Sequence, residues 1–225
     1  MKFGVLQFPG SCDELDAVAA ARLVGDAELI WHRDRDLKGA DAVIVPGGFS
    51  YGDYLRAGAI ARFSPAMEAL VEFAAGGGLV LGICNGFQVL CEAHLLPGAL
   101  LPNVNLRFTC RQLALQVVRE DSPFTCACAA GEQLSIPAKH AWGRYHADER
   151  TLAQIEQRGQ VLLRYAPGES FNGSLHDIAG VCNVEGNVFG LMPHPEHAVD
   201  ELTGGSADGL KLFRSMALAA EGARA

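Results

Sequence analysis

Three uninterrupted apolar runs constrain the fold of this 225-residue chain more than any other feature. They cover residues 42–45, 79–83 and 188–192, and each is followed closely by proline or glycine. A strand with one wet face alternates apolar and polar residues, whereas strands of a parallel sheet are covered on both faces and are apolar throughout. The sequence therefore predicts an α/β fold, with an open, mostly parallel sheet flanked by helices.

The other expected elements continue this alternation of strands and helices. Further strands are expected at residues 2–8, 29–31, 113–118, 161–165 and 178–182, and helices at residues 15–24, 65–75, 87–94, 151–157 and 206–220. No repeat, linker or low-complexity segment divides the chain, so we expect a single domain over residues 1–225. In open α/β sheets the site lies beyond the carboxyl ends of the strands.

Charge and composition argue against several classes of function. The formal net charge is −8 and Lys and Arg are not clustered, so neither nucleic acid nor an anionic membrane is an expected partner. No apolar run approaches the roughly 20 residues that span a bilayer. The seven cysteines are odd in number and irregular in spacing, which argues against a disulfide framework. We therefore expect a cytoplasmic protein in which most cysteines are buried.

One cysteine differs from the others in its setting. Cys84 lies between Gly82 and Gly86, after an apolar strand and before a helical segment. This spacing is typical of a nucleophile elbow, because the tight turn leaves no room for side chains at the flanking positions. A helix N-terminus also favours the thiolate, which is the reactive form. The alternative is that Cys84 is one more buried cysteine and that the glycines only end a strand.

A candidate base and its orienting group follow another apolar strand. His194 and Glu196 are two residues apart, and the flanking Pro193 and Pro195 favour an extended backbone that points both side chains the same way. His194 could then move protons for Cys84 while Glu196 fixes the tautomer of the imidazole. The alternative is an ordinary surface histidine beside a helix cap.

Backbone N–H groups that could stabilise an oxyanion are expected at two strand ends. The turn that begins at Pro46 follows the strand at 42–45, and its glycines let the chain approach a substrate closely. Gly48 or Phe49 would supply one donor, and Asn85, directly after the nucleophile, would supply the second. Taken alone, the same turn also fits an ordinary Pro-Gly turn.

These motifs resemble those of the class I, triad-type glutamine amidotransferases. The matching residues are the stretch from Gly82 to Gln88 and the triplet His194-Pro195-Glu196. Longer stretches resemble the glutaminase subunits of phosphoribosylformylglycinamidine synthase, and they lie at residues 46–56, 172–174, 177–183 and 194–213. The resemblance runs from the first strand to the last helix and is weakest between residues 119 and 170.

The resemblance implies a flavodoxin-like fold and a glutaminase that works through a cysteine thioester. Cys84 would attack the side-chain amide of glutamine with His194 and Glu196 as partners, and Gln88 would contact the substrate backbone. A large synthetase subunit would use ATP, Mg²⁺ and the ammonia to convert formylglycinamide ribonucleotide to formylglycinamidine ribonucleotide in purine biosynthesis. A small subunit would bridge the two, and this chain would bind no cofactor.

The sequence departs from the pattern of that family at two places. His140-Ala141-Trp142-Gly143 stands where the family usually has His-Gly-Glu-Gly, and His197 stands where it usually has Arg. Because Trp142 replaces the glutamate of the family pattern, a contact that this glutamate makes in the family is not expected in this chain. The second could weaken an ion pair near the site or make it sensitive to pH.

Three other interpretations remain open from the residues alone. A stand-alone cysteine hydrolase or peptidase would share the elbow but not the stretch at residues 46–56. A non-enzymatic member would bind a metabolite or partner without needing an intact triad. A metal site could draw on Cys126 and Cys128, or on His194 and His197. No matching second pair has zinc-like spacing, so no metal is expected.

Overall fold

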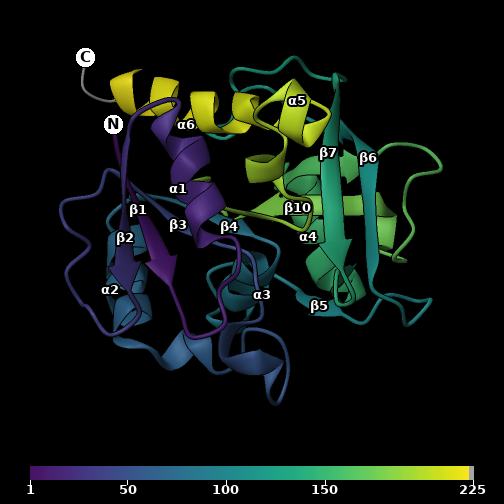
Figure 1. Ribbon diagram of the computed structural model, residues 1–225. Coiled ribbons are helices and arrows are strands. Elements are labelled where there is room, and N and C mark those ends of the chain that lie inside the picture. The colour runs from purple at the N-terminus through teal and green to yellow at the C-terminus, as the bar shows by residue number, and fades with distance from the viewer. Residues whose placement is uncertain (223–225) are drawn as a thin grey trace.

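The computed structural model describes residues 1–222, and one sheet of nine strands forms its frame (Figure 1). The strands follow the order β2-β1-β3-β4-β11-β10-β9-β6-β7, and a separate two-stranded sheet pairs β5 with β8. The strands are β1 (Lys2–Gln7), β2 (Asp26–Trp31), β3 (Ala42–Val45), β4 (Leu79–Ile83), β5 (Ala99–Leu101), β6 (Thr109–Val117), β7 (Gln133–His140), β8 (Arg144–His146), β9 (Val161–Tyr165), β10 (Ile178–Cys182) and β11 (Val188–Leu191). The helices are α1 (Glu14–Arg22), α2 (Pro65–Ala75), α3 (Asn85–Glu92), α4 (Glu149–Gln157), α5 (Glu201–Gly204) and α6 (Leu210–Gly222).

The five strands from β2 to β11 form the parallel part of the sheet. The register places Gly82 of β4 beside Val45 of β3 on one side and beside Gly190 of β11 on the other. Every residue of β3 and β11 is buried. Helix α3 packs against β3, β4 and β11, while α1 packs against β1 and β2. Burial on both faces is the physical reason for the continuous apolar runs. The predicted fold class, a mostly parallel α/β sheet flanked by helices, is confirmed.

The strands β10, β9, β6 and β7 extend the sheet through antiparallel pairs. Strand β7 was not predicted although its residues alternate between buried and less buried positions, because Pro137 lies in the middle of it and proline is a signal against a strand. Strand β6 begins at Thr109, four residues earlier than expected, because that first part is largely exposed and polar. The antiparallel region is therefore larger than the sequence indicated.

Four helices differ from their predicted bounds. Helix α1 spans Glu14–Arg22 instead of 15–24, and α4 begins at Glu149 instead of residue 151. Helix α3 begins at Asn85, immediately after Cys84, rather than at residue 87. The segment predicted as one helix over residues 206–220 instead begins at Leu210, and a short helix α5 precedes it and ends at Gly205 with φ 67°. A left-handed glycine of this kind terminates a helix because it cannot continue the right-handed turn.

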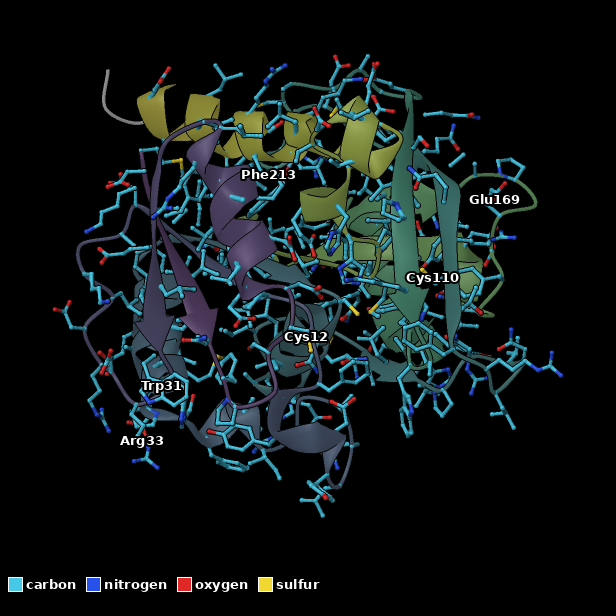
Figure 2. All side chains as sticks on the ribbon, viewed as in Figure 1. Cys12, Trp31, Arg33, Cys110, Glu169 and Phe213 are labelled. Carbon is cyan, nitrogen blue, oxygen red and sulfur yellow. The ribbon has the colours of Figure 1, made fainter. Side chains whose placement is uncertain are left out.

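All seven cysteines are free thiols, as the absence of a disulfide pattern predicted. Four are buried, whereas Cys12, Cys110 and Cys126 are exposed. Figure 2 shows Cys12 on the loop between β1 and α1 and Cys110 on β6. Within residues 1–222, no helix combines the length and apolar character needed to cross a membrane.

Candidate active site

Cys84 lies at a sharp bend between β4 and α3, at the carboxyl edge of the parallel strands. Its backbone has φ 49° and ψ −103°, and its N–H donates to Leu191 O at 2.8 Å. Such strained backbone persists at functional sites where the surrounding structure enforces it. A Cβ at Gly86 would collide with the backbone of Val45, and one at Gly82 would collide with the backbone of Gly86. The bend therefore has the geometry of a nucleophile elbow.

His194 and Glu196 form a buried, hydrogen-bonded pair directly after β11. His194 Nδ1 and Glu196 Oε1 are 2.6 Å apart, and the two residues are 1% and 4% exposed. The prediction of an extended backbone here is wrong, since Pro195–His197 form a 3₁₀ helix that brings the two side chains together. The N–H of His194 donates to Pro137 O at 2.7 Å, which ties the segment to β7.

The surroundings of His194 favour its protonated form. Burial lowers the pKa of the imidazole, but the charges of Glu196 and of the Cys84 sulfur raise it to about 10. Among the described residues, His194 Nε2 has no hydrogen-bond partner of standard geometry, while Nδ1 faces Glu196. An imidazolium beside a cysteine favours the thiolate, so this arrangement suits nucleophilic catalysis.

Asp13 also belongs to this site, although it was not predicted from the sequence. Its carboxylate lies 3.7 Å from His194 Nδ1, 2.6 Å from Lys139 Nζ and 3.2 Å from His197 Nε2. Burial raises the pKa of Asp13, but the hydrogen bond with His197 and the charges of His194 and Lys139 outweigh burial and hold it well below its usual range. Asp13 follows β1, so the rule that sites gather at strand ends could have found it.

The three expected oxyanion donors differ in how their N–H groups are used. The N–H of Phe49 donates to Gly10 O at 2.8 Å and is therefore already paired. Gly48 has φ 140°, and a Cβ there would collide with the backbone of Cys12 and Gly10. In the part of the chain that the structure describes, its N–H has no backbone acceptor. Asn85 is the first residue of α3, so its N–H has no acceptor within the helix.

Gln88 is fixed at the wall of the pocket by two hydrogen bonds. Its Oε1 accepts from Asn85 Nδ2 at 2.8 Å, and its Nε2 donates to Trp142 O at 2.6 Å. The side chain is 6% exposed and lies one helical turn from Cys84. Each amide atom keeps one further hydrogen-bonding position, so Gln88 can bind a ligand without rearrangement.

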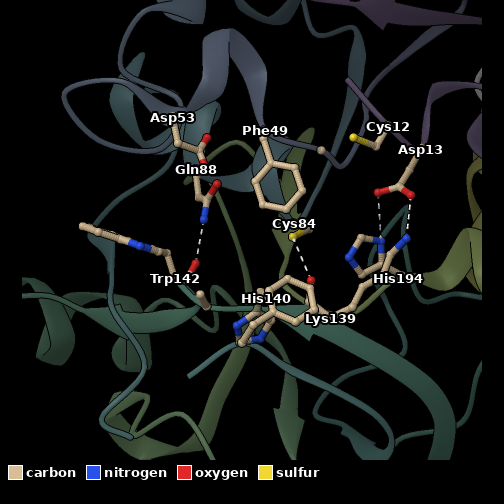
Figure 3. Close-up of a pocket in the computed structure, with 13 residues that line it drawn as sticks. Cys12, Asp13, Phe49, Asp53, Cys84, Gln88, Lys139, His140, Trp142 and His194 are labelled. Atoms are coloured by element: carbon tan, nitrogen blue, oxygen red, sulfur yellow. Dashed lines mark hydrogen bonds and ion pairs between the residues drawn. The ribbon is translucent and has the colours of Figure 1, made fainter. Parts of the chain in front are cut away.

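Strand β7 and the turn after it form the wall of the pocket that faces Cys84 (Figure 3). Lys139 O lies 4.0 Å from Cys84 Sγ. His140 is buried, and burial together with the charge on His194 lowers its pKa to about 3. Trp142, where the related family usually has Glu, contributes its carbonyl to Gln88. The two departures from the family pattern, at 141–142 and at His197, thus lie next to the pocket without removing any predicted site residue.

One group of side chains within residues 1–222 has the geometry of a metal site. Asp13, His194, Glu196 and His197 each offer one ligand atom, and these atoms lie within 4.8 Å of one another. The same atoms pair with one another in hydrogen bonds and ion pairs. Cys126 Sγ donates instead to the backbone of Ser215. The cluster is accounted for as a network of acids and bases around the imidazole.

Comparison with known proteins defines the class of this chain. A family model described as a CobB/CobQ-like glutamine amidotransferase domain matches residues 1–215. A solved structure of PurLQS from Thermotoga maritima is 43% identical, covers 96% of both chains and has a TM-score of 0.87. A glutamine amidotransferase from the same organism covers 97% of this chain and 96% of its own, with a TM-score of 0.63. That second structure is 14% identical, so it shows likeness of fold alone.

Curated relatives narrow this class. Phosphoribosylformylglycinamidine synthase subunit PurQ of Rubrobacter xylanophilus is 58% identical over 96% of this chain and 97% of its own length. The same subunit of Corynebacterium glutamicum is 56% identical over 95% of this chain and 96% of its own length. The chain therefore belongs to the family of PurQ subunits of phosphoribosylformylglycinamidine synthase, which confirms the resemblance read from its motifs.

Proposed function

We propose that this chain is the glutaminase subunit of a phosphoribosylformylglycinamidine synthase. One observation carries the proposal: a cysteine on a strained elbow shares a pocket with a buried, carboxylate-paired histidine contributed from far along the chain. A nucleophile, a base and an orienting carboxylate are the groups that amide hydrolysis through a thioester requires. The family of close relatives supports the same activity.

Catalysis begins at the side-chain amide of glutamine. The Cys84 thiolate attacks the amide carbon, and the carbonyl oxygen becomes an oxyanion. The N–H groups of Gly48 and Asn85 stabilise this charge, because neither has a backbone acceptor in the described residues. Phe49 is the weaker candidate for this role, since its N–H is paired with Gly10.

His194 acts first as an acid and then as a base. Its proton goes to the departing amide nitrogen, which leaves as ammonia while Cys84 keeps the glutamyl group as a thioester. The neutral imidazole then takes a proton from water, and the resulting hydroxide attacks the thioester to release glutamate. Glu196 holds Nδ1 throughout, so that Nε2 is the atom that exchanges protons with the reactants.

The ammonia serves a partner rather than this chain. The PurLQS name of the Thermotoga maritima structure supports a complex with two further subunits, a large synthetase and a small bridging protein. The synthetase uses ATP and Mg²⁺ to convert formylglycinamide ribonucleotide to formylglycinamidine ribonucleotide. The glutaminase chain itself, one domain over residues 1–225, needs no cofactor for thioester chemistry. We place the reaction in the cytoplasm, with the rest of purine synthesis.

Reconstitution with the synthetase and the bridging protein tests this function. Cys84→Ala should abolish formation of the amidine nucleotide from glutamine, and added ammonium salt should restore it. Cys110→Ala, which removes an exposed thiol on β6, should leave both activities intact. Release of glutamate at an unchanged rate by Cys84→Ala would contradict the proposal.

A further inference from the structure

The loop after β3 carries an acidic side chain into the pocket on a strained backbone. Tyr51, Asp53 and Leu55 have φ of 54°, 54° and 70°. This left-handed region is costly for most residues with a side chain. Residues held there cluster at sites that clamp ligands. Asp53 lines the same pocket as Cys84 and Gln88, on the side away from His194 in the view of Figure 3.

A chain of hydrogen bonds fixes Asp53 relative to the rest of the pocket. Asp53 Oδ1 accepts from Asn85 Nδ2 at 3.3 Å, and the same amide nitrogen donates to Gln88 at 2.8 Å. Asn85 Oδ1 accepts from the N–H of Ser50 at 3.0 Å, which ties the loop to the start of α3. Asp53 therefore has a defined position next to the residue expected to contact the substrate backbone.

The carboxylate of Asp53 has no cationic partner in the described part of the chain. Burial raises its pKa to about 6, and the hydrogen bond from Asn85 offsets burial only in part. Asp13 lies on the other side of Cys84 in Figure 3 and is instead paired with Lys139 and also with His197. One side of the pocket is therefore balanced in charge, and the other presents an unpaired acid. A partly buried acid of this kind is stabilised by a cation on a ligand.

We propose that Asp53 binds the α-ammonium group of glutamine, an inference that rests on the proposed glutaminase function. Glutamine carries its positive charge at the end of the molecule opposite to the amide carbon that Cys84 attacks. A carboxylate and a thiol in one pocket can therefore contact the two ends of one substrate. Charge-assisted hydrogen bonds are stronger than neutral ones, so Asp53 selects amides that bear an amine.

The test compares amides that keep or lose the α-ammonium, with the fully assembled enzyme complex. Glutaramate has the amide and carboxylate of glutamine but no amine, and 4-aminobutanamide has the amine but no carboxylate. Asp53→Asn keeps an oxygen that can accept from Asn85 and removes the charge. It should lower kcat/KM for glutamine and 4-aminobutanamide by about 10- to 100-fold, mainly through KM, and leave glutaramate unchanged. Where turnover is slow, inhibition constants against glutamine give the same comparison.

Two further variants make the result decisive. Asp121→Asn removes an exposed carboxylate that pairs with Arg119 and does not line the pocket. This control should change the rate with none of the three amides. Asp53→Glu keeps the charge and should keep most of the preference for glutamine over glutaramate, which guards against a folding defect in Asp53→Asn.

An equal loss with all three amides would overturn the proposal, because Asp53 would then only position Asn85 and Gln88. Unchanged kinetics with glutamine would overturn it as well. Failure of the glutaminase function itself looks different, since the unsubstituted complex would then release no glutamate from glutamine.

Discussion

The pocket joins two regions of the sheet that contribute different things to it. In the parallel region, Asp13, Gly48, Cys84 and His194 follow β1, β3, β4 and β11, so each stands where a buried strand ends. The antiparallel strand β7 lies across from them and supplies the pocket wall, including Lys139. The first region places reactive atoms through backbone bends, whereas the second sets the charge and the hydrogen bonds around them.

This difference predicts that substitutions in the two regions should lower activity by different amounts. Residues at the parallel strand ends act on bonds that form and break, so their loss should lower kcat steeply. Residues of the antiparallel wall act through a neighbour or on the bound substrate, so their loss should be smaller. The predictions below test that division, from the largest expected effect to the smallest.

The largest effect is expected from Glu196 in the parallel region. Glu196→Gln keeps the size of the side chain but removes the charge that orients and stabilises the His194 imidazolium. We expect kcat for glutamine hydrolysis to fall about 10³-fold with little change in KM. Steady-state glutamate release measures this. Glu169→Gln, which changes a half-buried acid paired with Arg111, is the control. A loss below tenfold would show that Asp13 can replace Glu196 as the partner of His194.

A smaller effect is expected from Lys139 in the antiparallel wall. Lys139→Met removes the cation that pairs with Asp13. Asp13 is only 5% exposed, so its buried negative charge would lose one of its positive partners. We expect a loss of about 1–3 kcal/mol in stability and about tenfold in kcat. Denaturant unfolding and steady-state kinetics measure the two. Adding Asp13→Asn should recover part of the stability, and strictly additive losses would contradict the coupling.

Sequence and structure agree best where burial makes a pattern regular. The bounds of β4, β9, β10 and α2 match those expected from their apolar runs and flanking glycines. Strand β7 has no such run because only one of its faces is buried, and Pro137 in its middle argued against a strand. The same holds within the pocket. Cys84 and His194 stand in recognisable local motifs, but the role of Lys139 depends on Asp13, a residue 126 positions away in the sequence.

A moderate dependence on pH is expected from Asp53. The pKa of Asp13 lies below its usual range and that of Lys139 is raised, while those of His140 and His194 are about 3 and about 10. None of these four groups therefore gains or loses a proton near pH 6. Burial raises the pKa of Asp53 to about 6, so its carboxylate takes up a proton as the pH falls through that value.

Loss of the Asp53 charge should lower kcat/KM for glutamine about fourfold between pH 7.5 and pH 5.5, because kcat/KM reports ionisations of the free enzyme. Initial rates across this range, with the synthetase supplied in excess, measure the change. Asp53→Asn should flatten this acid limb, and an unchanged limb in that variant would assign the titration to another group.

The smallest effect is expected from Trp142, although it lies on the pocket wall. Its contribution is a backbone carbonyl, which accepts from Gln88 at 2.6 Å. The buried Asn103 holds the turn from both sides: its N–H donates to Ala141 O at 2.8 Å, and its Oδ1 accepts from the N–H of Gly143 at 3.2 Å. Because these bonds do not involve the indole, Trp142→Ala should leave the carbonyl in place.

We therefore expect Trp142→Ala to change kcat/KM for glutamine by less than about twofold, whereas Asn103→Ala, which frees the turn, should raise KM by about tenfold. Both variants are measured in the assembled complex. A large loss in Trp142→Ala would mean that the indole itself contacts glutamine or the partner protein. The wall would then recognise its ligand through side chains as well as through its backbone, and the contrast between the two regions of the sheet would narrow.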